Sequence, residues 1–466
     1  MNKKRKLFIA GLFIFLHFNG YSQQEIDKDA ADFLSEFIQK KSITGTEKNA
    51  GTYLLDFCKS KGLYTRVFSD GDSTFNFCAS LYPLSANKPN IIFLNHLDVV
   101  PAGDTNEWKY PPFSGTIADS MIYGRGAIDC KGLAVMQLFS LLRFIDTARQ
   151  ADLPYNVSLL VVSGEEEGNN NGSEFVTGHF LNELNPAVVF GEGGSGVDSL
   201  VPSKPGMEVF GISVAEKKAL WLRLEARSKN YGHGAAPQEL YANKRLVKAL
   251  IRLLDEKKLV KFDKLTKTMF KDLGKMEGGI NGFVIRHIYW GLFRPFVKSY
   301  FSEGEPLHLF VYNTFVITNI YNPTIVNNEV AEKAYATLDC RLLPEMDTGQ
   351  FIRKIRQVAG PKISVSVISE SPGARPSDIN TIYYRTMSRT LQEVYPGSST
   401  IPILFPATTD NNYFRRNGIP VYGIIPAVLS GDLMKSVHNI NERIPVNMLT
   451  KGIDAYTGFL KGMLSE

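Results

Sequence analysis

Apolar residues recur at two spacings along this chain, and the spacing predicts where helices and strands lie. In residues 25–39 and 47–61 they return every three or four positions, which is typical of amphipathic helices. Short runs of consecutive apolar residues predict strands buried inside a sheet. These runs are 64–68, 75–82, 91–94, 157–162 and 187–190. A strongly apolar segment at 133–145 predicts a buried helix between two of them.

The pattern changes near residue 206, where apolar and polar positions begin to alternate. Residues 211–215 and 219–226 alternate as antiparallel strands do, and a helical pattern follows at about 242–255. Two further strands, a helix and a last strand are expected at 308–317, 333–342, 348–358 and 362–369. This order predicts an inserted β-α-β-β-α-β unit. A strand at 419–425 and a helix at 446–463 then return to the first sheet.

The length of 466 residues exceeds what one hydrophobic core usually supports, so we expect two domains. The predicted fold class is α/β: a mixed sheet flanked by helices, formed by residues 24–206 and 373–466. The inserted unit is a ferredoxin-like α+β lid domain at 207–372, which also serves dimerisation. Within the lid, residues 257–300 form a basic and aromatic helical insertion.

The first residues have the pattern of an export signal. Four consecutive basic residues at 3–6 precede an apolar stretch at 7–18, and small residues follow it. That stretch is short for a membrane-spanning helix, so we predict a signal peptide at residues 1–23 and an exported protein, periplasmic or secreted. An uncleaved signal anchor is the alternative.

Composition excludes some function classes. The formal net charge of +5 includes four basic residues of the N-terminal segment, which leaves 48 basic and 47 acidic residues in 24–466. This balance gives no support to nucleic-acid binding. The four cysteines are widely spaced without a Cys-x-x-Cys pair, so we expect them to be buried small hydrophobic residues.

Several of the predicted strands and loops end in histidine or carboxylate side chains. The predicted strand at 91–94 leads into His96 and Asp98, a glycine-rich loop carries Asp129, and the strand at 157–162 leads into three adjacent glutamates at 165–167. The remaining members of the set are Glu192, after a further strand, and His438, before the closing helix. Open α/β sheets keep their sites at the carboxyl ends of their strands, so these residues are expected to meet.

Nitrogen and oxygen ligands without thiolate favour Zn²⁺, with Mn²⁺ or Co²⁺ as less favoured occupants. Five ligands exceed the needs of one catalytic zinc. They match two metals about 3.5–4 Å apart that share a bridging carboxylate, which is the arrangement of two-metal hydrolases. A further carboxylate is then free to act as a base, and the tandem glutamates supply it.

Eight motifs in order resemble the M20 metallopeptidase family, most closely its carboxypeptidase S and N-acyl-amino-acid hydrolase branch. The motifs start at His96, Gly124, Gly164, Glu192, Gly232, Asn328 (with Arg341), Thr409 and His438. The resemblance covers nearly all of residues 24–466. It implies a zinc-peptidase-type sheet with a lid, and amide hydrolysis by attack of a metal-bridging water on a small peptide or an N-acyl amino acid.

The resemblance also implies a role for each site residue. Asp129 would bridge two Zn²⁺ ions. His96 and Glu192 would complete one metal site, and Glu166 and His438 the other. Asp98 would orient His96.

Four further residues take part in the implied reaction. Glu165 would be the general base, although the register Glu166/Glu167 is also open. His233 would stabilise the oxyanion, from the same chain after closure or from a partner subunit of a homodimer. Asn328 and Arg341 would hold a substrate carboxylate; an arginine inside a strand could equally be a structural ion-pair partner.

Two departures from the branch bear on specificity. Gly191 stands where an aspartate is usual before the ligand, and Asp410-Asn411-Asn412 replaces Asp-Ser-Arg, which weakens the expectation of a free substrate carboxylate. The preferred function is a carboxypeptidase- or dipeptidase-like hydrolase, and an N-acyl-amino-acid hydrolase is the alternative. A non-catalytic metal- or substrate-binding protein and a membrane-bound scaffold are weaker alternatives.

Overall fold

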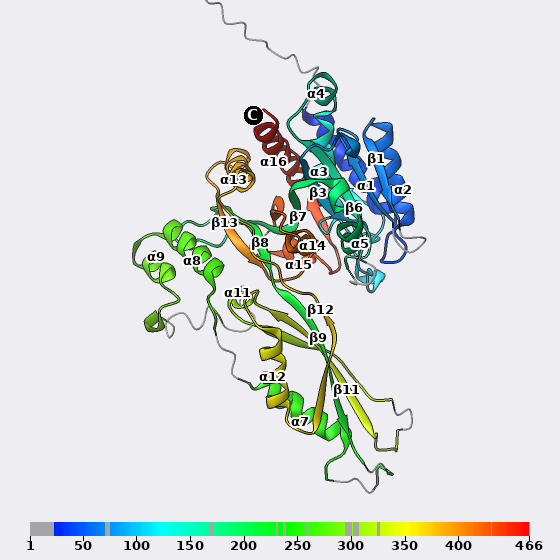
Figure 1. Ribbon diagram of the computed structural model, residues 1–466, viewed down its shortest axis with the longest axis vertical. Coiled ribbons are helices and arrows are strands. Elements are labelled where there is room, and N and C mark those ends of the chain that lie inside the picture. Colours follow the sequence, from blue (N-terminus) through cyan, green and yellow to red (C-terminus); the bar gives the residue numbers. More distant parts are fainter. Residues whose placement is uncertain are drawn as a thin grey trace, which may run out of the picture.

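The part of the chain that the computed structural model describes contains an eight-stranded, a four-stranded and a three-stranded β-sheet, and the first two form the large and the small sheet of Figure 1. It describes residues 23–69, 75–166, 171–229, 232–235, 239–256, 260–293, 301, 307–323, 327–429 and 431–465. Residues 1–22 of the predicted signal peptide (1–23) and Glu167 therefore lie outside the described residues, as do parts of the 257–300 insertion. No helix in the described ranges is both long and apolar enough to cross a membrane.

The large sheet has eight strands and carries most of the predicted site. In spatial order they are β1 (Tyr64–Phe68), β2 (Asn76–Ser80), β6 (Asn156–Val162), β3 (Asn90–His96), β7 (Pro186–Val197), β14 (Val421–Val428), β8 (Val209–Glu216) and β13 (Ser399–Phe405). β3 pairs in parallel with both β6 and β7, and β14 pairs in parallel with β7. β1, β2 and β8 bring antiparallel pairings, so the sheet is mixed, as predicted.

Helices cover both faces of this sheet because its central strands are apolar on both sides. Ile91 and Phe93 of β3 point into the main core, whereas Ile92 and Leu94 point into a second cluster. The main core is closed by α1 (Gln23–Gln39), α2 (Lys48–Ser60), α3 (Lys131–Leu142), α13 (Ile382–Val394) and α16 (Val446–Leu464). The opposite cluster is closed by α5 (Gly172–His179), α6 (Leu181–Leu184) and α14 (Asn411–Arg416).

The small sheet confirms the ferredoxin-like prediction. Its strand order is β10 (Thr314–Tyr321), β11 (Lys333–Leu342), β9 (Lys218–Arg227) and β12 (Ile363–Glu370), all antiparallel. Alternate residues of β9 are buried against α7 (Ala242–Leu254) and α12 (Thr348–Ala359), which pack on one face. We call this unit of β9–β12, α7 and α12 the lid; in Figure 1 it extends away from the large sheet.

Two sequence expectations for this region are corrected. β8 lies in the large sheet, whereas the predicted lid began at residue 207; every residue of β8 is buried, so it is a central strand and not an alternating lid strand. The expected strand at 308–317 begins as a short helix, α11 (His308–Val311), and only Thr314 onward is extended. His308 and Val311 share one buried side of that helical turn, which a strand would not give.

Smaller elements complete the chain. The helical insertion contains α8 (Lys264–Glu277), α9 (Gly279–Arg286) and η3 (Gly291–Phe293), and α8 packs on β13. A three-stranded sheet of β15 (Arg443–Pro445), β5 (Met121–Tyr123) and β4 (Ile117–Ala118) joins the two loops that carry Asp129 and His438. The other elements are α4 (Ile145–Gln150), α15 (Asp432–Ser436), η1 (Leu84–Ala86) and η2 (Thr105–Glu107).

Candidate metal centre

The carboxyl ends of three neighbouring parallel strands bring the predicted ligands together. His96 is the last residue of β3, Glu165 and Glu166 follow β6, and Glu192 lies within β7. Parallel neighbours end at the same edge of a sheet, which is why runs far apart in the sequence deliver side chains to one place. Asp129 reaches this edge from the loop before α3.

The side chains form two groups that share Asp129. In one group His96 Nε2 lies 3.1 Å from Asp129 Oδ1 and 3.9 Å from Glu192 Oε1. In the other group His438 Nε2 lies 3.0 Å from Asp129 Oδ2 and 3.2 Å from Glu166 Oε2. The atoms offered within each group all lie within 4.8 Å of one another. These are the two sets that the family resemblance assigns to two metal ions.

A third group brings Glu165 together with His96 and Glu166. The candidate base therefore lies beside both ligand sets. Burial and the nearby Glu192 carboxylate raise the pKa of Glu165 well above its usual value. A carboxylate whose pKa is raised in this way is suited to accept and return a proton near neutral pH.

Cys130 also borders the first group but has the character of an inert thiol. Burial raises its pKa to about 12, and its Sγ donates to Asn95 Oδ1 at 3.4 Å. A zinc ligand would need to be the thiolate. Cys130 is therefore not counted among the candidate ligands, which are nitrogen and oxygen donors.

Asp98 contacts residues of both groups of candidate ligands and holds them in place. The backbone carbonyl of Asp98 lies 2.9 Å from His96 Nδ1, which leaves Nε2 directed at the ligand set. Its carboxylate accepts the backbone N–H groups of Glu165 at 3.1 Å and Glu166 at 3.0 Å, and the hydroxyl of Thr44 at 3.0 Å. Burial acts to raise the pKa of Asp98, but the contact with His96 and these donors outweigh it and lower the pKa.

Glu442 is a supporting residue to which the sequence analysis assigned no role. Its buried carboxylate accepts from Arg125 Nη1 at 2.8 Å and from the backbone N–H groups of Gly126, Ile128 and Asp129 at 2.9–3.2 Å. Arg125 also donates to the carbonyl of Asn439. The pair thus fixes the Asp129 loop against the His438 loop. It joins residues 317 positions apart, and the only sequence signal was a glutamate inside the His438 motif.

The electrostatics of the cluster favour a bound cation. Burial and the neighbouring Asp129 raise the pKa of Glu192 to about 8. Hydrogen bonds to Asp129 and Glu166 raise the pKa of His438 to about 10. Protons thus stabilise a crowded acidic cluster, and divalent cations can take their place.

A buried oxygen atom without a hydrogen-bond partner also favours a bound cation. Glu166 Oε1 is buried and has no hydrogen-bond partner among the residues that the structure describes. Buried carboxylate oxygens normally have partners, and a metal ion would provide one. The residues present therefore fit a metal-binding site.

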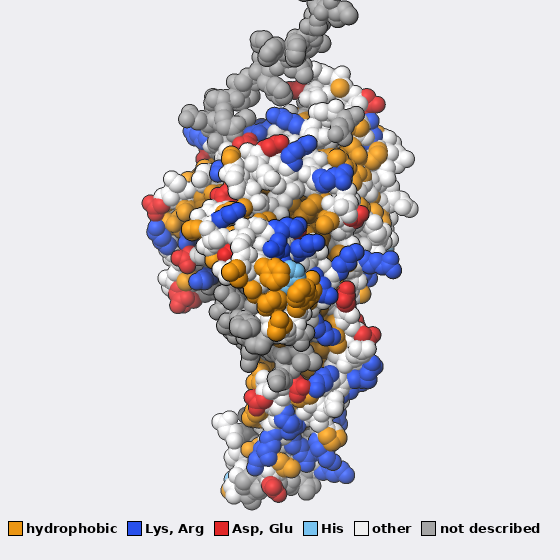
Figure 2. All heavy atoms as spheres, turned by 90° about the vertical axis from the view of Figure 1, so that its left-hand side faces the viewer, with side chains coloured by type: hydrophobic (Ala, Val, Ile, Leu, Met, Phe, Trp, Pro, Cys, Tyr) orange, Lys and Arg blue, Asp and Glu red, His pale blue; other side chains and the backbone are white. Residues whose placement is uncertain are grey.

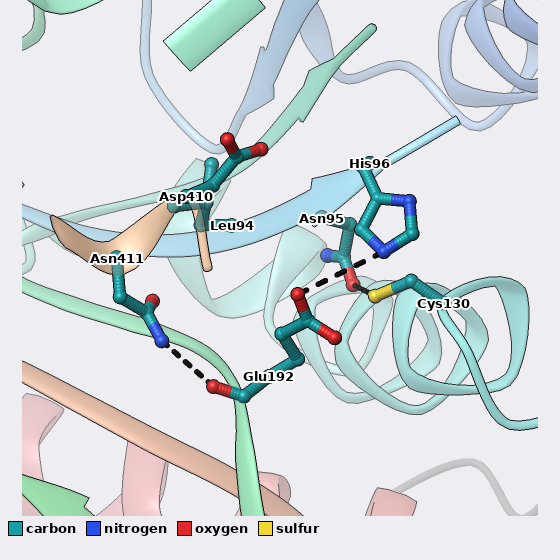
Figure 3. Close-up of a pocket in the computed structure, with 7 residues that line it drawn as sticks. All are labelled: Leu94, Asn95, His96, Cys130, Glu192, Asp410 and Asn411. Carbon is teal, nitrogen blue, oxygen red and sulfur yellow. Dashed lines mark hydrogen bonds and ion pairs between the residues drawn. The ribbon is translucent and has the colours of Figure 1, made fainter. Parts of the chain in front are cut away.

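A small cavity of about 10 Å³ lies directly behind His96 and Glu192 (Figure 3). The side chain of Asn411 points toward the backbone of Glu192, and its Nδ2 donates to the Glu192 carbonyl at 2.7 Å. Asp410 also lines the cavity and accepts from Asn171 Nδ2 at 2.7 Å. Asn411, in the segment that departs from the family branch, therefore holds the backbone of Glu192.

The predicted lid residues lie apart from the metal centre. His233 and Asn328 are neighbours, with His233 Nε2 3.2 Å from Asn328 Nδ2. They lie beyond the end of β9 that is more distant from the large sheet. The ten residues of β9 make this strand about 30 Å long. Arg341 lies at the near end, opposite Ala219, where it pairs with Asp339 at 2.9 Å and donates to Thr408 at 3.3 Å. The alternative of a structural ion pair is thus observed for Arg341.

The sequence of this chain is similar to a known protein family and to several of its members. Residues 92–462 match the family model described as "Peptidase family M20/M25/M40". The human "N-fatty-acyl-amino acid synthase/hydrolase PM20D1" is 27% identical over 78% of this chain and 73% of its own length. The "Probable carboxypeptidase S-like 2" of Dictyostelium discoideum is 26% identical over 80% of this chain and 71% of its own length.

Solved structures share the fold. The M20 family metallo-carboxypeptidase Sso-CP2 from Sulfolobus solfataricus has a TM-score of 0.71 at 23% identity, and the match covers 94% of this chain and all of that chain. Human carnosine dipeptidase 1 has a TM-score of 0.68 at 18% identity, covering 95% of this chain and 98% of that one.

Proposed function

The chain belongs to peptidase family M20/M25/M40 and is a metal-dependent hydrolase, and we propose that it cleaves the amide bond of short peptides with two Zn²⁺ ions and a glutamate base. One observation carries the proposal. Two groups of histidine and carboxylate side chains share Asp129, and Glu165 lies beside both.

The two ions would be held by the residues whose geometry is described above. His96, Asp129 and Glu192 would hold one ion, and Asp129, Glu166 and His438 the other. When bound, the ions would polarise the scissile carbonyl and lower the pKa of water.

Protein groups would carry the proton. Glu165 would take it from the attacking water and return it to the leaving amine, and its raised pKa suits both steps. Asp98 keeps Glu165 in place, because its carboxylate holds the backbone N–H of that residue. His233 would stabilise the oxyanion once the lid tip approaches a metal centre of its own chain or of a partner subunit. Asn328, beside His233, would reach the substrate carboxylate from the same tip, whereas Arg341 would reach it from the opposite, near end of a lid, so the two would come from different chains.

The alternative substrate is an N-acyl amino acid. The similarity to the human N-fatty-acyl-amino acid synthase/hydrolase favours it. The helical insertion gives it less support, because α8 packs on β13 and no described residue of α8 or α9 lines the cavity behind His96. The replacement of the usual arginine by Asn412 does not separate the two classes, because both substrates carry a free carboxylate.

The test combines metal content with amine release from a panel of dipeptides and N-acyl amino acids. We expect two metals per chain and hydrolysis that a chelator abolishes, with the panel deciding between the substrate classes. Absence of stoichiometric metal would contradict the proposal. Glu165→Gln separates an enzyme from a binding protein, because only an enzyme should lose rate while keeping its metal.

We further propose that residues 1–23 direct export, with a signal anchor as the alternative, and that the lid serves dimerisation. Cleavage before Gln24 in the exported protein and its sedimentation behaviour would test these two points.

A further inference from the structure

The outer side of α9 and η3 carries large apolar side chains in an unusually exposed position. Ile280 is 83% exposed and Leu292 75%, and the aromatic rings of Phe283 and Trp290 are almost half exposed. Phe283, His287, Trp290 and Phe293 are in mutual ring contact at centroid distances of 4.3–6.5 Å. We call this group the α9 patch. Figure 2 faces this side of the molecule and shows an apolar cluster there with Lys and Arg side chains around it.

The packing of the insertion fixes the orientation of the patch. α8 turns Met269, Phe270 and Leu273 toward Val209 and Ile401 of the large sheet. α9 lies directly against α8, because Gly274 and Gly282 face each other with no room for a Cβ on either. The apolar side chains of α9 that do not contact α8 are therefore held outward by a rigid support.

A stripe of lysines borders the patch. Lys264, Lys267, Lys271 and Lys275 recur at intervals of three and four on α8 and are all exposed. They lie opposite the buried face of that helix. Lys267 Nζ lies 5.5 Å from the centre of the Tyr289 ring, which places the stripe beside the aromatic cluster.

The excess of positive charge is concentrated in the helical insertion. Residues 257–300 carry ten basic and three acidic residues, a net charge of +7. The rest of 24–466 carries 38 basic and 44 acidic residues. Exposed aromatic and aliphatic side chains next to clustered lysines are the composition of elements that lie in the interface of an anionic bilayer.

We propose that the α9 patch and the lysine stripe dock this protein on the surface of an anionic lipid bilayer. The rings and aliphatic chains enter the headgroup region, and the lysines contact acidic headgroups. The match between a +7 segment and a negatively charged surface selects this partner over a neutral one. The proposal is independent of the substrate and of the N-terminal segment.

The test places a fluorophore in the patch of the full-length chain. Leu292→Cys gives one exposed thiol, because the four native cysteines are buried. An environment-sensitive dye at that position should shift to the blue with vesicles of phosphatidylglycerol and phosphatidylethanolamine, but not with phosphatidylcholine alone. A dye at Ile320→Cys, exposed on the lid sheet, is the matched control and should not respond.

Variants then separate the two contributions. Each lysine near an anionic surface changes binding about fivefold, so replacing all four lysines of the stripe by glutamine should weaken binding at least a hundredfold. Phe283→Ser should weaken it about tenfold. Lys354→Gln with Lys362→Gln, two exposed lysines of the lid, should have no effect.

Three results would overturn the proposal. The first is a dye at position 292 that does not respond to anionic vesicles, and the second is a response that survives the loss of all four lysines. The third is a shift that depends on protein concentration without lipid and coincides with faster sedimentation, which would identify the patch as an interface between two copies.

Discussion

Residues of the same predicted site are buried and held by hydrogen bonds at the candidate metal centre, but are exposed at the tip of the lid. At the metal centre His96 and Asp98 are buried, and Asp98 and Glu442 fix the loops that carry the ligands. At the tip His233 and Asn328 are exposed and contact each other. The first region is preorganised, whereas the second can act only after a movement of about 30 Å or through a second chain.

The largest effect should come from Glu165→Gln, at the preorganised end. Loss of a general base costs about 10²–10⁴ in kcat. Metal content should equal that of the unaltered protein, because Glu165 belongs to neither of the two sets of side chains that share Asp129. Steady-state kinetics with metal analysis measures both quantities. Glu174→Gln, an exposed acid on α5, is the control, and equal losses in the two variants would contradict the assignment.

His233→Ala tests the role of the exposed lid tip. Removing an oxyanion donor costs about 10²–10³ in kcat, although His233 is remote from the candidate metal ligands in this structure. His179→Ala, another exposed histidine, should be silent.

Mixing chains sharpens this test. If a partner subunit supplies His233, a mixture of Glu165→Gln and His233→Ala chains should regain activity that neither has alone. Recovery absent at every mixing ratio would favour closure within one chain.

A smaller effect is expected for Glu442→Gln. Partners of metal ligands typically contribute 10–100-fold to metal affinity, and Glu442 holds the loop of Asp129. Titration with a competing chelator measures the affinity. Glu277→Gln changes a buried glutamate of the insertion and should leave metal affinity unchanged.

The smallest effect concerns the stability of the metal-free protein. Glu192 has a pKa raised to about 8 and His438 to about 10, so the folded state keeps protons that the unfolded state has released. Stability should therefore fall as pH rises from about 5 to 10. Thermal unfolding at several pH values measures this trend, and added zinc should reverse it. A melting temperature that rises with pH without metal would contradict it.

Much of this organisation could be predicted from local sequence. The run before His96 and the acid run after β6 indicated both the strands and a set of side chains that meet, because parallel strands are apolar throughout and end at one edge. The sequence pattern placed β8 in the lid because an apolar strand does not reveal which sheet it joins.

Long-range support could not be predicted in the same way. The Arg125–Glu442 pair has no local pattern, since its members meet only when two distant loops pack. The distance of His233 from the candidate metal ligands is likewise a property of the length and direction of β9 in three dimensions.

The contact between α8 and β13 determines whether the chain stays soluble when the helical insertion is deleted. β13 is the last strand of the large sheet, and an uncovered edge strand is a template for pairing with other chains. Deletion of residues 257–300 would expose this edge and the apolar surface around Ile401. A chain shortened in this way should aggregate, so the insertion is better altered by single surface substitutions than removed.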